Sequence, residues 1–155
     1  SVKKIDQEGN VRSFPGGFGT ITGIAVDQEG LVYIVSASGH SIWKLDYENS
    51  QSDYVAGNNG EGDEDGSPSK FRFPKDIVVD HEGNLYVADE GNNKIRKITT
   101  DNQVETYAGG TFGSNDGSGI NAQFKLPYGL AIGSGGTLYV ADTGNHRVVI
   151  NHLNF

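Results

Sequence analysis

The chain has 155 residues, which suits one domain, and it contains 23 glycines but no cysteine. This glycine content is about twice the usual share and indicates many tight turns and few long helices. The formal net charge of −8 disfavours a nucleic-acid partner, which needs a basic surface, and it disfavours an anionic membrane surface for the same reason. The lack of cysteine excludes disulfides, thiol chemistry and thiolate-bound zinc.

Residues 1–17 contain two short runs of strand-forming residues joined by a turn. The segment reads VKKIDQEGNVRSF, and it matches IRKITTDNQVETY at residues 95–107. Gly, Asn and Asp in the joining turns tolerate left-handed backbone conformations. We therefore predict that residues 1–17 form the outer half of a repeating unit whose complete form lies further along the chain.

Three longer stretches carry the repeat itself: residues 18–57, residues 71–110 and, in part, residues 124–155. They align with one another without gaps over their central parts at a shift of 53 residues. Tyr33, Tyr86 and Tyr139, for example, hold one equivalent position. A fixed period of this length is the signature of a repeat architecture.

The second repeat shows four strand patterns separated by turns. We predict strands at Asp76–Asp80, Leu85–Asp89, Lys94–Thr99 and Val104–Ala108. The first is continuously apolar, as in a strand buried on both faces. In the third, Arg96 and Lys97 alternate with isoleucines, as expected of a half-exposed outer strand. Four strands joined by tight turns form a meander, and meanders repeated around an axis form an all-β β-propeller of four-stranded antiparallel blades.

Two long links join the repeats, at Gly57–Pro74 and Gly110–Pro127. They carry the carboxylates Asp63, Glu64, Asp65 and Asp116. No glutamate follows in the position that an EF-hand loop requires. We expect a flexible acidic loop here, with a weak site for Ca²⁺ or another divalent cation as the alternative, and we expect no other cofactor.

The residues from Phe71 to Ile98 read FRFPKDIVVDHEGNLYVADEGNNKIRKI, and those from Phe124 to Val148 follow the same pattern. This pattern resembles the NHL repeat. The residues from Thr22 to Leu45 depart from it, because Ser36 replaces an aspartate. The resemblance implies a β-propeller, usually of six blades, and it implies no particular chemistry, since fold and function are separate questions.

The strand patterns add up to about three blades, half of a six-bladed ring. Three blades cannot close a ring, and an open arc exposes apolar blade faces. Two alternatives stay open: a homodimer that closes a six-bladed ring about a two-fold axis, or a segment of a longer chain. The sequence does not decide the compartment, and an extracellular location stays open.

One face of the predicted propeller gathers the turns between second and third strands together with the long links, and we call it the long-loop face. Loops on a rigid scaffold commonly carry binding. Thr22, Lys75 and Tyr128 precede the innermost strands and should lie near the mouth of the central channel. We predict that these three residues bind a ligand.

A column of turn residues lies on the same face. His40, Asn93 and His146 occupy equivalent positions in successive repeats. Two imidazoles and an amide could bind a ligand, hold a transition metal or transfer protons, and a structural role in the turn is the alternative. Asp89 and Asp142 end the second strands, and we expect them to cap backbone N–H groups there rather than bind a metal.

The sequence contains no nucleophile elbow, phosphate loop or zinc-binding histidine pair. The favoured hypothesis is therefore a non-catalytic scaffold that recognises a protein, peptide or glycan through the long-loop face. The alternative is a metal-assisted lyase or hydrolase of the six-bladed propeller type, whose channel would need residues from further blades. RNA binding is a third hypothesis, which the negative net charge disfavours.

Overall fold

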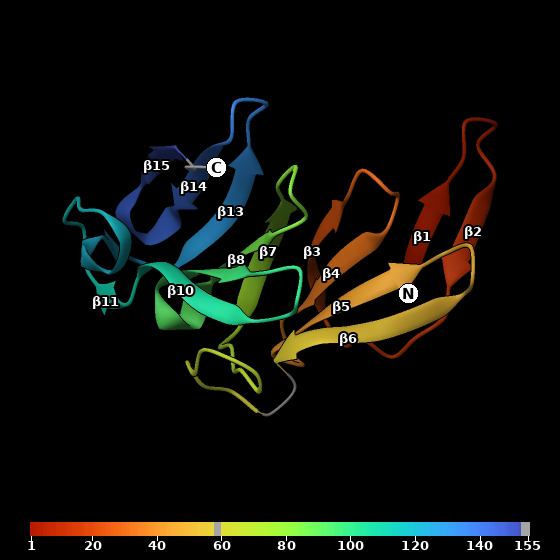
Figure 1. Cartoon of the computed structure of the whole chain (residues 1–155), viewed down its shortest axis with the longest axis horizontal. Helices are drawn as coiled ribbons and strands as arrows, with labels where there is room; N and C mark the ends of the chain where they lie inside the picture. The colour runs from red at the N-terminus through yellow and green to blue at the C-terminus, as the bar shows by residue number, and fades with distance from the viewer. Residues whose placement is uncertain (58–59, 153–155) are drawn as a thin grey trace.

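The computed structural model describes residues 1–57 and 60–152, and its sheets follow one another along an arc (Figure 1). Two sheets have four antiparallel strands in sequential order, as the meander prediction requires. The first blade consists of β3 (Ile21–Val26), β4 (Val32–Ser36), β5 (Ser41–Asp46) and β6 (Gln51–Gly57). The second blade consists of β7 (Pro74–Val79), β8 (Leu85–Asp89), β9 (Lys94–Ile98) and β10 (Val104–Gly109).

Partial sheets occupy the two ends of the arc (Figure 1). The N-terminal hairpin pairs β1 (Val2–Ile5) with β2 (Val11–Phe14), in the register of the two outer strands of a blade. The third blade has three strands: β13 (Pro127–Ile132), β14 (Thr137–Asp142) and β15 (Arg147–His152). A short parallel pair, β11 (Thr111–Phe112) and β12 (Gln123–Phe124), closes the second long link.

The predicted strands of the second repeat are confirmed to within two residues at each end. The helices of the described residues are single 3-10 turns: η1 (Glu90–Asn92), η2 (Gly119–Asn121) and η3 (Thr143–Asn145). Among the described residues, therefore, no helix could cross a membrane. Successive side chains of β8 pack against opposite neighbours, Leu85 and Val87 in one hydrophobic cluster and Tyr86 and Ala88 in the next, as in a sheet stacked between two others.

Adjacent blades stack through hydrophobic clusters that repeat with the sequence. Tyr33 and Ile42 of the first blade share one cluster with Ile77 of the second. Tyr86 and Ile95, which are their equivalents in the second blade, share the next cluster with residues of β13 and β14. The repeat therefore preserves a blade-to-blade interface as well as a strand pattern.

Candidate functional site

A buried aspartate anchors the long-loop face in the second blade. Asp89 is fully buried at the end of β8. Its carboxylate accepts hydrogen bonds from the backbone N of Arg72 at 2.7 Å and from Asn92 Nδ2 and Arg96 Nη1, each at 2.8 Å. Burial raises the pKa of Asp89, and these three donors oppose that rise. The expected bond to a backbone N–H is present, but its donor, Arg72, lies in the incoming link and not in the adjacent turn, where we expected it.

Arg96 is fully buried, so the prediction of a half-exposed position on the outer strand is wrong. Its guanidinium donates to Asp89 and to Asp65 Oδ1, the latter at 2.6 Å. It also lies 5.1 Å from the ring centre of Phe71. The alternation rule failed because the link folds back over the third strand and covers this side chain.

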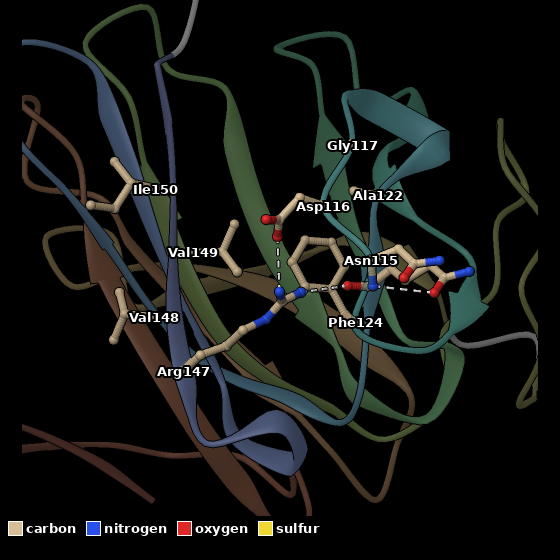
Figure 2. Close-up of a pocket in the computed structure, with 10 residues that line it drawn as sticks. Asn115, Asp116, Gly117, Ala122, Phe124, Arg147, Val148, Val149 and Ile150 are labelled. Carbon is tan, nitrogen blue, oxygen red and sulfur yellow. Dashed lines mark hydrogen bonds and ion pairs between the residues drawn. The ribbon is translucent and has the colours of Figure 1, made fainter.

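The third blade has the same anchor, but its arginine lies two positions earlier in the third strand. Asp142 is also fully buried and accepts from the backbone N of Lys125 at 2.7 Å and from Arg147 Nε at 2.8 Å. Arg147 begins β15, where the second blade has Lys94. Figure 2 shows its guanidinium reaching Asp116 of the link, with Val149 pointing toward Phe124. These residues line a groove of about 490 Å³ beside β15.

The acidic residues of the first link are held by cations. Asp63 accepts from Lys94 Nζ at 2.8 Å, Glu64 from Lys70 Nζ at 2.9 Å, and Asp65 from Arg96. The acidic side chains of the described part of this link, residues 60–73, therefore have defined cationic partners, which the expectation of a flexible acidic loop did not include. Within residues 1–57 and 60–152, no group of three His, Asp or Glu side chains could hold a metal ion.

The contact between Asp63 of the first link and Lys94 should weaken in acid. The pKa of Asp63 lies below its ordinary value, first because Lys94 donates to its carboxylate and then because of the positive charge of Lys94. A depressed pKa in the folded state contributes stability at higher pH that is lost as the pH falls through that pKa. We expect carboxyl NMR titration to give Asp63 a midpoint below that of an ordinary aspartate, and Lys94→Met to raise it. An unchanged Asp63 midpoint in Lys94→Met would show that Lys94 does not stabilise the carboxylate of Asp63.

His40 and Asn93 each hold the link that leads into the next blade. His40 Nδ1 accepts from the backbone N of Phe73 at 3.2 Å. One repeat later, Asn93 Oδ1 accepts from the backbone N of Leu126 at 3.0 Å. His40 and Asn93 have φ angles of 49° and 53°, which asparagine tolerates better than most residues. Their side chains therefore position the links.

His146 has the same left-handed conformation, with φ of 53°, and its side chain is exposed. It belongs to the third blade, the last along the described arc. The structure thus brings His40, Asn93 and His146 into one kind of position on successive blades and not into one cluster. Each of the three lies in a turn beside the start of the third strand of its blade.

The two link residues that His40 and Asn93 hold have an unusual backbone conformation. Phe73 and Leu126 have φ angles of 48° and 52° and are both 43% exposed. Bulky residues rarely adopt positive φ, and a following proline disfavours helical backbone further. Such strain concentrates at binding sites. The repeated Phe-x-x-Pro pattern offered a sequence signal for these positions, but only the backbone angles reveal the strain.

Thr22, Lys75 and Tyr128 connect neighbouring blades beside these residues. Thr22 Oγ1 donates to the carbonyl of Pro74 at 3.2 Å. Lys75 Nζ lies 5.7 Å from the ring centre of Tyr128 and 3.4 Å from a carboxylate oxygen of Glu90. Tyr128 is 47% exposed. We call Phe73, Leu126 and Tyr128 the junction set, because each lies where a link enters an innermost strand.

Comparison with known proteins identifies two of the repeats. The family model described as "NHL repeat" matches residues 71–98 and 124–150. The chain carries NHL repeats. These two NHL repeats cover the parts of the second and third blades that contain Asp89 and Asp142, whereas the first blade, with Ser36 at this position, lies outside the match.

The relatives of these NHL repeats are much longer proteins. The protein SUPPRESSOR OF QUENCHING 1, chloroplastic, of Arabidopsis thaliana is 33% identical over 134 residues, which cover 79% of this chain and 13% of that protein. NHL repeat-containing protein 2 of Bos taurus is 39% identical over 83 residues, or 52% of this chain and 11% of that protein. The chain therefore spans a small fraction of the length of these relatives.

A solved structure shows the same fold. An auxiliary nutrient binding protein from Bacteroides thetaiotaomicron superimposes with a TM-score of 0.78 at 22% identity, over 94% of this chain and 41% of that chain. At this identity the likeness concerns the fold alone. It agrees with about three β-propeller blades in the present chain.

Proposed function

We propose that this chain is a non-catalytic recognition scaffold whose long-loop face binds a protein, peptide or glycan. The observation that carries the proposal is the junction set. Phe73 and Leu126 are exposed in a strained backbone conformation, and the side chains of His40 and Asn93 hold the links that present them. Strain of this kind persists where the surrounding structure enforces it, often at ligand-binding positions.

The chemistry of the face suits a ligand with both apolar and polar groups. Exposed aromatic rings such as Phe73 and Tyr128 offer flat apolar contacts. The ammonium of Lys75 lies beside the ring of Tyr128 and is paired with the carboxylate of Glu90, and both charged groups offer hydrogen bonds. In this proposal Thr22, Lys75 and Tyr128 contact the ligand, whereas His40, Asn93 and, by equivalence, His146 position the links. No metal takes part.

Asparagine substitutions test the junction set. Asparagine accepts positive φ more readily than phenylalanine or leucine, so Phe73→Asn and Leu126→Asn should raise the free energy of unfolding by up to about 1 kcal/mol. Binding should weaken at least tenfold, because exposed apolar contacts at a site centre carry much of the binding energy. Denaturant unfolding and binding to peptide and glycan arrays measure the two effects.

The matched control is Ile5→Asn, since Ile5 is 69% exposed at the end of β1 and lies outside the long links and the turns of the long-loop face. It should leave array binding unchanged. The proposal would be contradicted if the Phe73 and Leu126 variants gained stability and kept their binding. It would also be contradicted if the parent chain bound to neither array.

The alternative of a metal-assisted lyase or hydrolase makes a different prediction. Chelation would then abolish ligand turnover, and substitution of His40 or His146 would affect the chemical step more than stability. No observation on the described residues favours this alternative, so it stays second to the recognition scaffold.

A further inference from the structure

The first blade leaves open a space that the other two blades fill with their incoming links. In the second blade, Arg96 donates there to Asp65 and to the carbonyl oxygen of Glu64, which both belong to the link. In the third blade, Arg147 donates to Asp116 of its own link. An arginine and an acidic link thus occupy this place in both blades.

The first blade has neither arginine and no long link. Trp43 stands at the position of Arg96, and Ser41 stands at the position of Arg147. The link into this blade consists only of residues 15–20, between the strands β2 and β3 (Figure 1). A pocket of about 180 Å³ therefore stays open beside β5, and the chain on either side of this link is present.

Uncharged groups line this pocket. Three serines contribute to it, together with glycines and the rings of Phe18 and Trp43, and none of the described residues that line it is charged. A Cβ on Gly39 would lie 2.6 Å from Ser36 Oγ and 3.1 Å from Ser41 Oγ, so these two hydroxyls converge on the space that the glycine leaves free. Such a pocket suits an uncharged ligand, because an ion would lose its hydration here without gaining a counter-charge.

Two of the serine hydroxyls have a proton left to donate. Ser41 is 2% exposed, and its Oγ accepts from Trp43 Nε1 at 3.0 Å. Ser38 Oγ accepts from the backbone N of Thr20 at 2.9 Å. Each serine hydroxyl also carries one proton, and no described residue accepts either of these two protons. A buried donor without an acceptor is costly, so Ser41 points to a ligand that brings an oxygen atom.

We propose that this pocket binds one ring of a neutral sugar. Ser38 and Ser41 donate to hydroxyl oxygens of the sugar, and an apolar face of its ring lies against the flat ring of Trp43. A sugar hydroxyl accepts as well as donates, so it supplies the acceptor that Ser41 lacks. An acidic peptide resembling the long links fits less well, because the arginines that hold those links are absent here.

The pocket contains no member of the junction set, so it is a second site that goes beyond the function proposed above. Trp43 is the single tryptophan of the chain, and its fluorescence therefore reports on this pocket. The probes are the methyl glycosides of glucose, galactose, mannose and N-acetylglucosamine. At least one of them should change the emission of the parent chain in a saturable way.

Two further measurements with the same signal sharpen this test. Methyl glucuronide, which carries a charge, should bind at least ~10-fold more weakly than the methyl glycoside of glucose. Phe73→Asn and Leu126→Asn should leave the response to sugars unchanged, which separates a failure of this pocket from a failure of the junction set.

Two substitutions test the pocket itself, with calorimetry as the measurement. Ser41→Ala removes the buried donor and should weaken sugar binding about tenfold. Gly17→Leu places a side chain at the pocket, and a Cβ on Gly17 meets no atom within 4 Å. It should therefore weaken binding at least ~10-fold by obstruction and leave the fold undisturbed.

The matched control is Gly135→Leu. A Cβ on Gly135 also meets no atom within 4 Å, and Gly135 lies in the turn between β13 and β14, away from the pocket. This variant should bind sugar like the parent chain.

Three results would overturn the proposal. A parent chain whose Trp43 emission responds to none of the four glycosides would have no sugar site here. Sugar binding that Ser41→Ala and Gly17→Leu both leave unchanged would place the sugar elsewhere. A response to a synthetic peptide of residues 61–70, but to no glycoside, would show that the pocket takes a peptide like the long link instead.

Discussion

Replacement of Arg96 by methionine should cost about 3–5 kcal/mol of the free energy of unfolding, because it leaves a buried carboxylate without its cation. Asp89 and Arg96 are both fully buried, 2.8 Å apart. Methionine fills much of the same space with apolar atoms, so the loss measures the ion pair together with the bonds from Arg96 to Asp65 and to the carbonyls of Glu64 and Lys70. Urea unfolding at neutral pH, with the slope of the transition checked for constancy, gives the value.

The cost of Arg96→Met should shrink in acid. Burial raises the pKa of Asp89, and removal of Arg96 raises it further. A raised pKa in the folded state means that the folded chain binds a proton more readily than the unfolded one, so the variant regains stability as the pH falls through that pKa. Asp89→Asn in the same chain should recover part of the loss at neutral pH.

The control for this prediction is Lys97→Met. Lys97 follows Arg96 on β9, and it forms a long pair of 4.0 Å with Glu105, whose side chain is 60% exposed. Such exposed pairs contribute about 0–1 kcal/mol. If Arg96→Met were no more harmful than Lys97→Met, the buried ion pair would not anchor the link.

Gly23→Ala should destabilise the contact between the first two inner strands by about 1–3 kcal/mol, as overpacking of a close contact does. A Cβ at Gly23 would lie 2.7 Å from the Cα of Asp76 and 2.9 Å from the carbonyl oxygen of Lys75. Both are backbone atoms and cannot move aside as a side chain would. The expected result is a lower urea midpoint with an unchanged slope.

The equivalent glycine of the third blade provides the matched comparison. A Cβ at Gly129 would meet only the Cβ of Ala141, at 3.6 Å, which is an ordinary contact. Gly129→Ala should therefore be neutral or slightly stabilising, because alanine restricts the unfolded chain. Equal effects of the two substitutions would contradict a close approach that is specific to β3 and β7.

The sequence by itself determined the repeat, the strand order within each blade and the β-propeller class. These follow from local turn residues and apolar periodicity, which act over a few residues. It also assigned Asp89 and Asp142 to bonds with backbone N–H groups, but it placed those groups in the adjacent turns, whereas the donors, Arg72 and Lys125, lie 17 residues away in the links.

Only the tertiary structure decided what the long links do. Arg96 is buried because Asp65, 31 residues away, folds over it, and His40 reaches the backbone of Phe73 across 33 residues. Periodicity along one strand carries no information about contacts at such separation. The strained backbone of Phe73 and Leu126 likewise depends on such distant bonds, from His40 and Asn93. The candidate binding surface therefore could not be predicted from the sequence alone.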